Sequence, residues 1–240
     1  MTQIEFSSSN RMFVSVLKTI KEQGGDETAS WPSILENDLD KIRKTDAFDL
    51  NDPKQLQQKV FFYIHLYFAR RGRENDRSLK TNAFIFRKDD TELEYCVLKY
   101  FEKTKNHQVS SASQTKARMY ATGEKNCPVL TLKLYISKLS SDTDIFYRHP
   151  KSSKLPEKGY TNKQMGVNAL GIMMKNISKR LNLSQIYTNH SIRATVVTLL
   201  ASKGFHPHQI MRVTNHKCER SLRSYVKDNT VAQKRHISEQ

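Results

Sequence analysis

The residues of this chain that are equipped for chemistry lie mainly in its C-terminal half. His190 and Arg193 are three positions apart, so a helix would place an imidazole and a guanidinium on one face. We expect Asn189 to be the N-cap of that helix, whose free N–H groups and dipole favour an anion. His216 follows Arg193 by 23 residues, and Tyr225 follows His216 by nine. A helical hairpin of this length can return its far end to its start, so all four side chains are able to share one pocket.

Two further basic residues lie upstream. Arg71 ends an amphipathic segment, and Lys105 follows an expected strand. Arginine binds phosphate through two parallel N–H groups and stays charged. Tyrosine can form a covalent phosphoester, and lysine can protonate a leaving oxygen. With two histidines and no carboxylate cluster, this set of residues indicates attack on a phosphodiester without a metal.

The charge distribution also indicates a partner that carries phosphates. The 240 residues hold 40 Lys+Arg and 24 Asp+Glu, a formal net charge of +16. Residues 1–60 carry a net charge of −2, and residues 61–240 carry +18. Contacts of Lys and Arg with phosphates release condensed counterions, so this charge indicates a nucleic acid. The alternative is a basic surface that only aids solubility.

Several classes of protein are disfavoured. No stretch approaches 18 uncharged apolar residues, and the first residues form neither a basic nor an apolar signal region, so we expect no membrane span and no secretory signal. Three scattered cysteines favour a reducing, intracellular compartment. His206, His208, His216 and Cys218 raise the question of zinc, but their spacing matches no structural zinc pattern. We expect no metal and no other cofactor.

The hydrophobic pattern predicts helices, then a small antiparallel sheet, then helices again, which is an α+β order. Asp52 followed by Pro53 is a strong helix start, and the apolar residues after it indicate one buried face as far as Phe68. We expect strands at 82–88, 94–101 and 115–121, with a polar loop at about 140–159. The other expected helices lie at 9–23, about 34–42, 128–139, 164–181, 190–203, 207–213 and 219–226.

The ordered set from Arg71 to Tyr225 resembles the signature of tyrosine recombinases, the phage-integrase-type enzymes that transfer DNA strands. The segments YFARRGREN, EKTKN, CPVLTLKLYISK, GVNALGIMMKNISKRLNL, TNHSIR and TNHK with SLRSY resemble, more narrowly, the Crypton-derived group of animal recombinase-like domains. The resemblance covers roughly residues 55–230. It implies a mainly helical α+β catalytic fold with a small antiparallel three-stranded sheet. The implied divisions are a short helical N-terminal region at 1–52, the catalytic domain at 53–230 and a tail at 231–240.

The resemblance also implies roles for the phosphate-binding residues. Arg71 and Arg193 would clamp the scissile phosphate, His190 would assist proton transfer, and His216 would donate a hydrogen bond to the phosphate. Before the second histidine the family usually has glycine. Asn215 stands there in this chain, and asparagine tolerates the same left-handed backbone.

The reacting residues follow from the same resemblance. Tyr225 would be the nucleophile that leaves a 3′-phosphotyrosyl bond. Lys105 would be the general acid for the 5′-oxygen, with Lys103 as a close rival.

The first arginine position has rivals as well. Arg70 and Arg73 lie beside Arg71, and Arg71 is preferred because Glu74 then falls where the family has a glutamate.

The resemblance therefore implies cleavage and rejoining of double-stranded DNA, in site-specific recombination or DNA integration. It implies no ATP, no metal and no membrane, with a nuclear location and self-association on DNA as further expectations. Complete recombinases carry a sizeable N-terminal DNA-clamping domain, whereas about 50 slightly acidic residues precede the catalytic part here. The alternative is a domesticated, catalytically inactive module that binds DNA or a nuclear protein.

Overall fold

The computed structural model describes residues 9, 11–16, 19, 31–44, 46–72, 75–99, 117–151, 159–216 and 219–223. The chain divides into two compact units, residues 1–30 and 31–240. In the first unit, residues 11–16 are helical, inside the helix expected at 9–23. The second unit holds the main core and the described residues with expected roles in chemistry.

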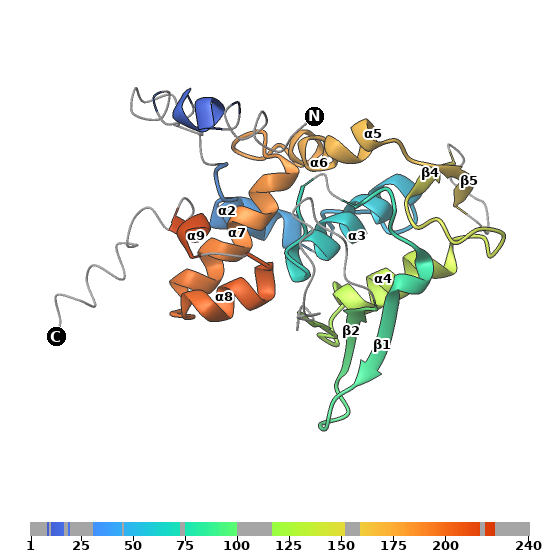
Figure 1. The fold of residues 1–240 in the computed structure, drawn as a ribbon. Coiled ribbons are helices and arrows are strands. Elements are labelled where there is room, and N and C mark those ends of the chain that lie inside the picture. The colour runs from blue at the N-terminus through green and yellow to red at the C-terminus, as the bar shows by residue number, and fades with distance from the viewer. Residues whose placement is uncertain are drawn as a thin grey trace. The chain divides into compact units, whose positions relative to one another are not determined.

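In its described residues the second unit is mainly helical, with two small antiparallel sheets (Figure 1). Its helices are α2 (Glu36–Arg43), α3 (Pro53–Tyr67), α4 (Pro128–Ser137), α5 (Val167–Gly171), α6 (Met173–Arg180), α7 (Asn189–Ser202), α8 (Pro207–Thr214) and α9 (Arg220–Arg223), with a 3₁₀ turn at Thr81–Ala83. Its strands are β1 (Phe84–Lys88), β2 (Glu94–Leu98), β3 (Met119–Tyr120), β4 (Arg148–Pro150) and β5 (Tyr160–Gln164). The α+β class and the three-stranded sheet are as predicted.

Helix α3 is the centre of this unit. The Asp52 carboxylate caps it by accepting hydrogen bonds from the amides of Lys54 and Gln55 at 2.8 and 3.1 Å. Every residue from Leu56 to His65 is buried. The expectation of one buried face was therefore too narrow, because α4, α6 and α7 all pack against this helix.

The three-stranded sheet has the order β1-β2-β3 and lies beside α4. In the hairpin of β1 and β2, Phe84 pairs with Leu98 and Lys88 pairs with Glu94. Strand β3 joins through the pairing of Cys96 with Met119.

The second sheet, β4-β5, shows that the predictions of a loop at 140–159 and of a helix beginning at Gln164 were wrong. Strand β5 lacks alternating apolar residues, and a long-range contact holds it in place. Tyr160 is buried and donates a hydrogen bond to the Pro53 carbonyl at 2.7 Å. The fully buried Arg148 donates from its guanidinium to the carbonyls of residues 140, 143 and 145. The helical stretch starts later, at Val167, and is interrupted at residue 172.

Residues 31–52 belong to the same compact unit as the rest of the core. Ile34, Leu39, Ile42 and Phe48 are all buried in the main hydrophobic cluster. The boundary at residue 52 between an N-terminal region and a catalytic domain stays a prediction. In the part of the chain that the structure describes, no helix is both long enough and apolar enough to cross a bilayer.

Candidate functional site

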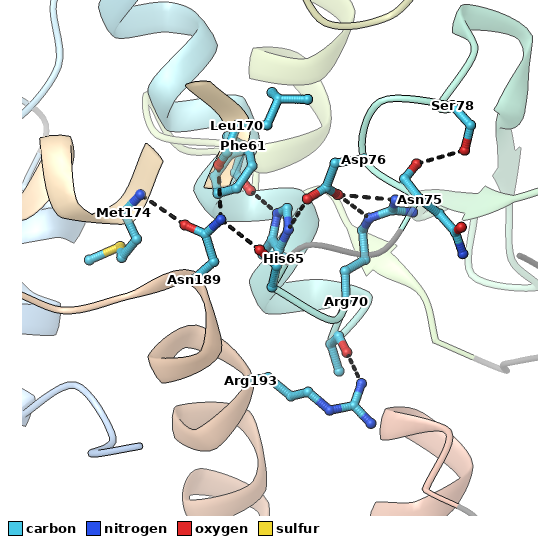
Figure 2. Close-up of polar contacts among 12 residues, drawn as sticks. Phe61, His65, Arg70, Asn75, Asp76, Ser78, Leu170, Met174, Asn189 and Arg193 are labelled. Atoms are coloured by element: carbon cyan, nitrogen blue, oxygen red, sulfur yellow. Dashed lines mark hydrogen bonds and ion pairs between the residues drawn. The ribbon is translucent and has the colours of Figure 1, made fainter. Parts of the chain in front are cut away.

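The start of α7 is built around a buried amide. Asn189 is the first helical residue and not the N-cap, which is Thr188. Its side chain lies inside the protein, where Oδ1 accepts from the Met174 amide at 3.0 Å. Its Nδ2 donates to the carbonyls of Gly72 and Leu170 at 2.8 and 2.9 Å (Figure 2). One side chain thus joins the loop after α3, the end of α5 and the start of α6 to the helix that carries His190 and Arg193.

Arg193 is 6% exposed and is held from two sides. Its Nη1 donates to the Ala69 carbonyl at 2.5 Å, and its Nη2 donates to the Thr214 carbonyl. Figure 2 shows the side chain reaching from α7 to the turn after α3. Ala69 has a φ of 45°, an uncommon value for a residue with a Cβ. The guanidinium therefore has a defined orientation at the junction of three chain segments.

His216 lies beside that guanidinium. Its Nε2 lies 3.3 Å from Arg193 Nη2, and its Nδ1 lies 2.6 Å from Thr214 Oγ1. Thr214 Oγ1 donates to the Ile210 carbonyl at 2.7 Å, so Nδ1–H donates to the hydroxyl and Nε2 accepts from Arg193. The preceding Asn215 is left-handed, with a φ of 56°, as predicted.

The surroundings of His216 favour a neutral ring. Burial, and then the positive charges of Arg193 and Arg71, lower the pKa of His216 from 6.5 to about 4. Arg71, which is half-buried, therefore acts electrostatically on the same imidazole that Arg193 contacts. This arrangement concentrates positive charge at one point.

The neighbouring Arg70 has a different environment. It is 5% exposed and forms an ion pair with Asp76 at 3.2 Å, and the same carboxylate contacts His65 at 3.2 Å (Figure 2). Burial alone would raise the pKa of Asp76, but the charges and hydrogen bonds of His65 and Arg70 outweigh it and hold that pKa below its usual value. Arg70 thus stabilises the loop after α3, whereas the side chain of Arg71 is the one coupled to His216.

His190 lies one helical turn before Arg193 on α7. A Cβ on the buried Gly72 would be 2.9 Å from the backbone nitrogen of His190, so the loop after Arg71 closely approaches the start of α7. The half-buried imidazole stacks on the indole of Trp31, with ring centroids 5.5 Å apart. Sequence reasoning did not find Trp31, Thr214 or the clamping role of Asn189, because no local pattern links them to the site.

The structure therefore brings three of the six expected site residues together, Arg71, Arg193 and His216, and the backbone of His190 adjoins the loop that follows Arg71. Lys105 and Tyr225 lie outside the described residues, as do the rivals Lys103 and Arg73. The catalytic roles of all six remain predictions.

Comparison with solved structures identifies the fold. The XerH site-specific recombinase, bound to a palindromic difH substrate in a post-cleavage complex, matches with a TM-score of 0.56 and 15% sequence identity over 89% of this chain and 55% of that chain. The Tn1549 transposon integrase in complex with circular intermediate DNA matches with a TM-score of 0.51 and 15% identity over 89% of this chain and 68% of that chain. The chain has the tyrosine-recombinase catalytic fold, as predicted.

The likeness at this identity concerns the fold, and the chain spans about half the length of XerH. No protein-family model matches the chain, and no curated protein matches it in sequence.

Proposed function

We propose that this domain cleaves and rejoins DNA strands through a 3′-phosphotyrosyl intermediate, in site-specific recombination or DNA integration. The observation that carries the proposal is the cationic junction, where His216 lies 3.3 Å from the buried Arg193 guanidinium and also feels the charge of Arg71. Two guanidinium groups at one point are suited to a phosphodiester, which they can bind through several charge-assisted hydrogen bonds. The recombinase fold supports the same proposal.

In the proposed reaction, Tyr225 Oη attacks the scissile phosphorus and its proton passes to His190. The Tyr–O–P bond forms and the P–O5′ bond breaks, while Lys105 or its rival Lys103 protonates the leaving 5′-oxygen. A 5′-hydroxyl reverses the step and rejoins the strand. One phosphoester bond replaces another, so the reaction consumes neither ATP nor an oxidant.

The junction would stabilise the charge that develops on the phosphorane. Arg193 is already oriented by two carbonyls, so little reorganisation is needed when the phosphate binds. His216 accepts from Arg193 in the free site, and it must carry its proton on Nε2 to donate to a phosphate. Thr214 Oγ1 would then donate to Nδ1 instead of accepting from it. We propose that DNA binding brings about this exchange of donor and acceptor.

The partner in this proposal is double-stranded DNA, with self-association of the protein on it. The net charge of +16 supports a polyanionic partner. From the resemblance in sequence we also propose descent from a Crypton-like transposable element and a nuclear location.

A covalent trap tests the reaction. The full chain is incubated with a randomised library of nicked suicide duplexes, and protein–DNA adducts are isolated under denaturing conditions and sequenced. Wild type should form an adduct, with or without EDTA. Tyr225→Phe should form none while its DNA affinity stays within about threefold, because the ring is kept and only the attacking hydroxyl is lost. Tyr67→Phe, on α3, is the matched control and should keep the adduct.

Three results would contradict parts of this proposal. An adduct that persists in Tyr225→Phe would reject the nucleophile. An adduct that disappears with EDTA would reject the metal-independent mechanism. Tight DNA binding without any adduct across the library would favour the alternative of a catalytically inactive DNA-binding module.

A further inference from the structure

Trp31 lies against the site but outside the expected set of residues. It is the single tryptophan of the chain, and its ring stacks on His190 with centroids 5.5 Å apart and planes inclined by 13°. Trp31 is nevertheless 48% exposed. Burial in the core therefore does not account for its position, since a large indole left half in solvent gains only part of the free energy of burial.

The segment that carries this indole is fixed to α7 and to the residues before it. The Ile34 amide donates to Thr195 Oγ1, on α7, at 2.8 Å. The Leu35 amide donates to Tyr187 Oη at 3.2 Å, and that hydroxyl donates to the buried Asp38 carboxylate at 2.9 Å. Because the acceptors of the two amides lie on α7 or just before it, the segment that carries the indole is tied to the helix that presents His190.

We propose that Trp31 is a positioning residue for His190 in DNA strand transfer, and this inference rests on the function proposed above. Parallel stacking covers one face of the imidazole and restricts its rotation. A proton acceptor held in one orientation loses less freedom when it meets the reacting hydroxyl. Residues 31–35, which precede the expected catalytic domain, thus complete the site.

The contact itself is tested without DNA. Since Trp31 is the only tryptophan, the fluorescence emission of the whole protein reports on this one stack. His190→Ala should change the emission intensity of the folded protein, because the stacked ring is removed. His208→Ala, an exposed position on α8, should not. Equal emission from wild type and His190→Ala would overturn the stacking contact.

The positioning role is tested by the rate of adduct formation in single turnover. A duplex with a 5′-bridging phosphorothiolate keeps slow variants measurable, because its leaving group needs no protonation. Trp31→Ala should slow the reaction about 3- to 10-fold with unchanged DNA affinity, and Trp31→Phe should restore most of the rate. In a His190→Ala background, Trp31→Ala should have no further effect.

Each other outcome overturns the inference. Independent, multiplicative losses in the double variant would mean that Trp31 does not act through His190. A loss of DNA affinity without a loss of rate would make Trp31 a DNA contact. If wild type binds DNA but forms no adduct, the proposed function fails and the positioning role fails with it, whereas the fluorescence comparison still decides whether the rings are stacked.

Discussion

The buried amide of Asn189 gives the sharpest prediction from this structure, because its three hydrogen bonds join separate segments. Asn189→Ala removes one acceptor and two donors at a position that is 1% exposed. The carbonyls of Gly72 and Leu170 and the amide of Met174 would each lose a partner where water has little access. The loop that follows Arg71 would also lose its tie to α7.

The size of the effect follows from these contacts. A buried polar group left without its partner costs roughly 1–3 kcal/mol. Partial relaxation reduces the sum over three such groups, so we expect the free energy of unfolding to fall by about 3–5 kcal/mol. A domain of this size loses roughly 2–4 °C of Tm per kcal/mol, so Tm should fall by roughly 6–20 °C.

The assay is urea unfolding followed by circular dichroism, together with thermal unfolding. Asn168→Ala is the matched control, since Asn168 is an exposed residue of α5. It should change the free energy of unfolding by less than about 0.5 kcal/mol. A loss below about 1 kcal/mol in Asn189→Ala, or equal losses in both variants, would refute the clamping role.

Three further predictions concern the same junction and its charge. Gly72→Ala should lower the free energy of unfolding in urea by about 1–3 kcal/mol, because the new Cβ would lie 2.9 Å from the backbone of His190. Gly166→Ala is the control and should be nearly neutral, because its Cβ would meet nothing within 4 Å. Equal losses of stability in the two variants would contradict the close approach at Gly72. Because folding lowers the pKa of His216 from 6.5 to about 4, its contribution to stability is complete above pH 6.5 and is lost as the pH falls toward 4, where the unfolded chain binds the proton first. His216→Gln should flatten the stability–pH curve in that window and His208→Gln should not; a curve like that of wild type in His216→Gln would count against the shift. DNA affinity, measured by fluorescence anisotropy, should fall more than about tenfold between 50 and 200 mM salt, and a flat response would exclude binding dominated by phosphates.

Much of the fold was predictable because its signals are local. The Asp52–Pro53 start of α3, the β1-β2 hairpin and the left-handed Asn215 each depend on a few adjacent residues. The β4-β5 pair was not predictable in this way, since Tyr160 donates to the carbonyl of the distant Pro53 and the Arg148 carbonyl accepts from the distant Gln57. Hydrogen bonds of this kind produce no periodic pattern of apolar residues in the sequence.

The sequence by itself determined which residue types are available for phosphate chemistry and that His190 and Arg193 share a helix face, because a spacing of three residues is a property of the helix. It did not separate the environments of Arg70 and Arg71, which are adjacent. Only the tertiary structure did so. Arg70 forms an ion pair with the buried Asp76, whereas the charge of Arg71 lowers the pKa of His216, which lies on another segment of the chain.

The stack of Trp31 on His190 was likewise decided by packing, since 159 positions separate the two rings along the chain. Side-chain periodicity reports which residues share one face of one element. Contacts between elements depend on how all the buried faces fit together, and that is a property of the whole fold.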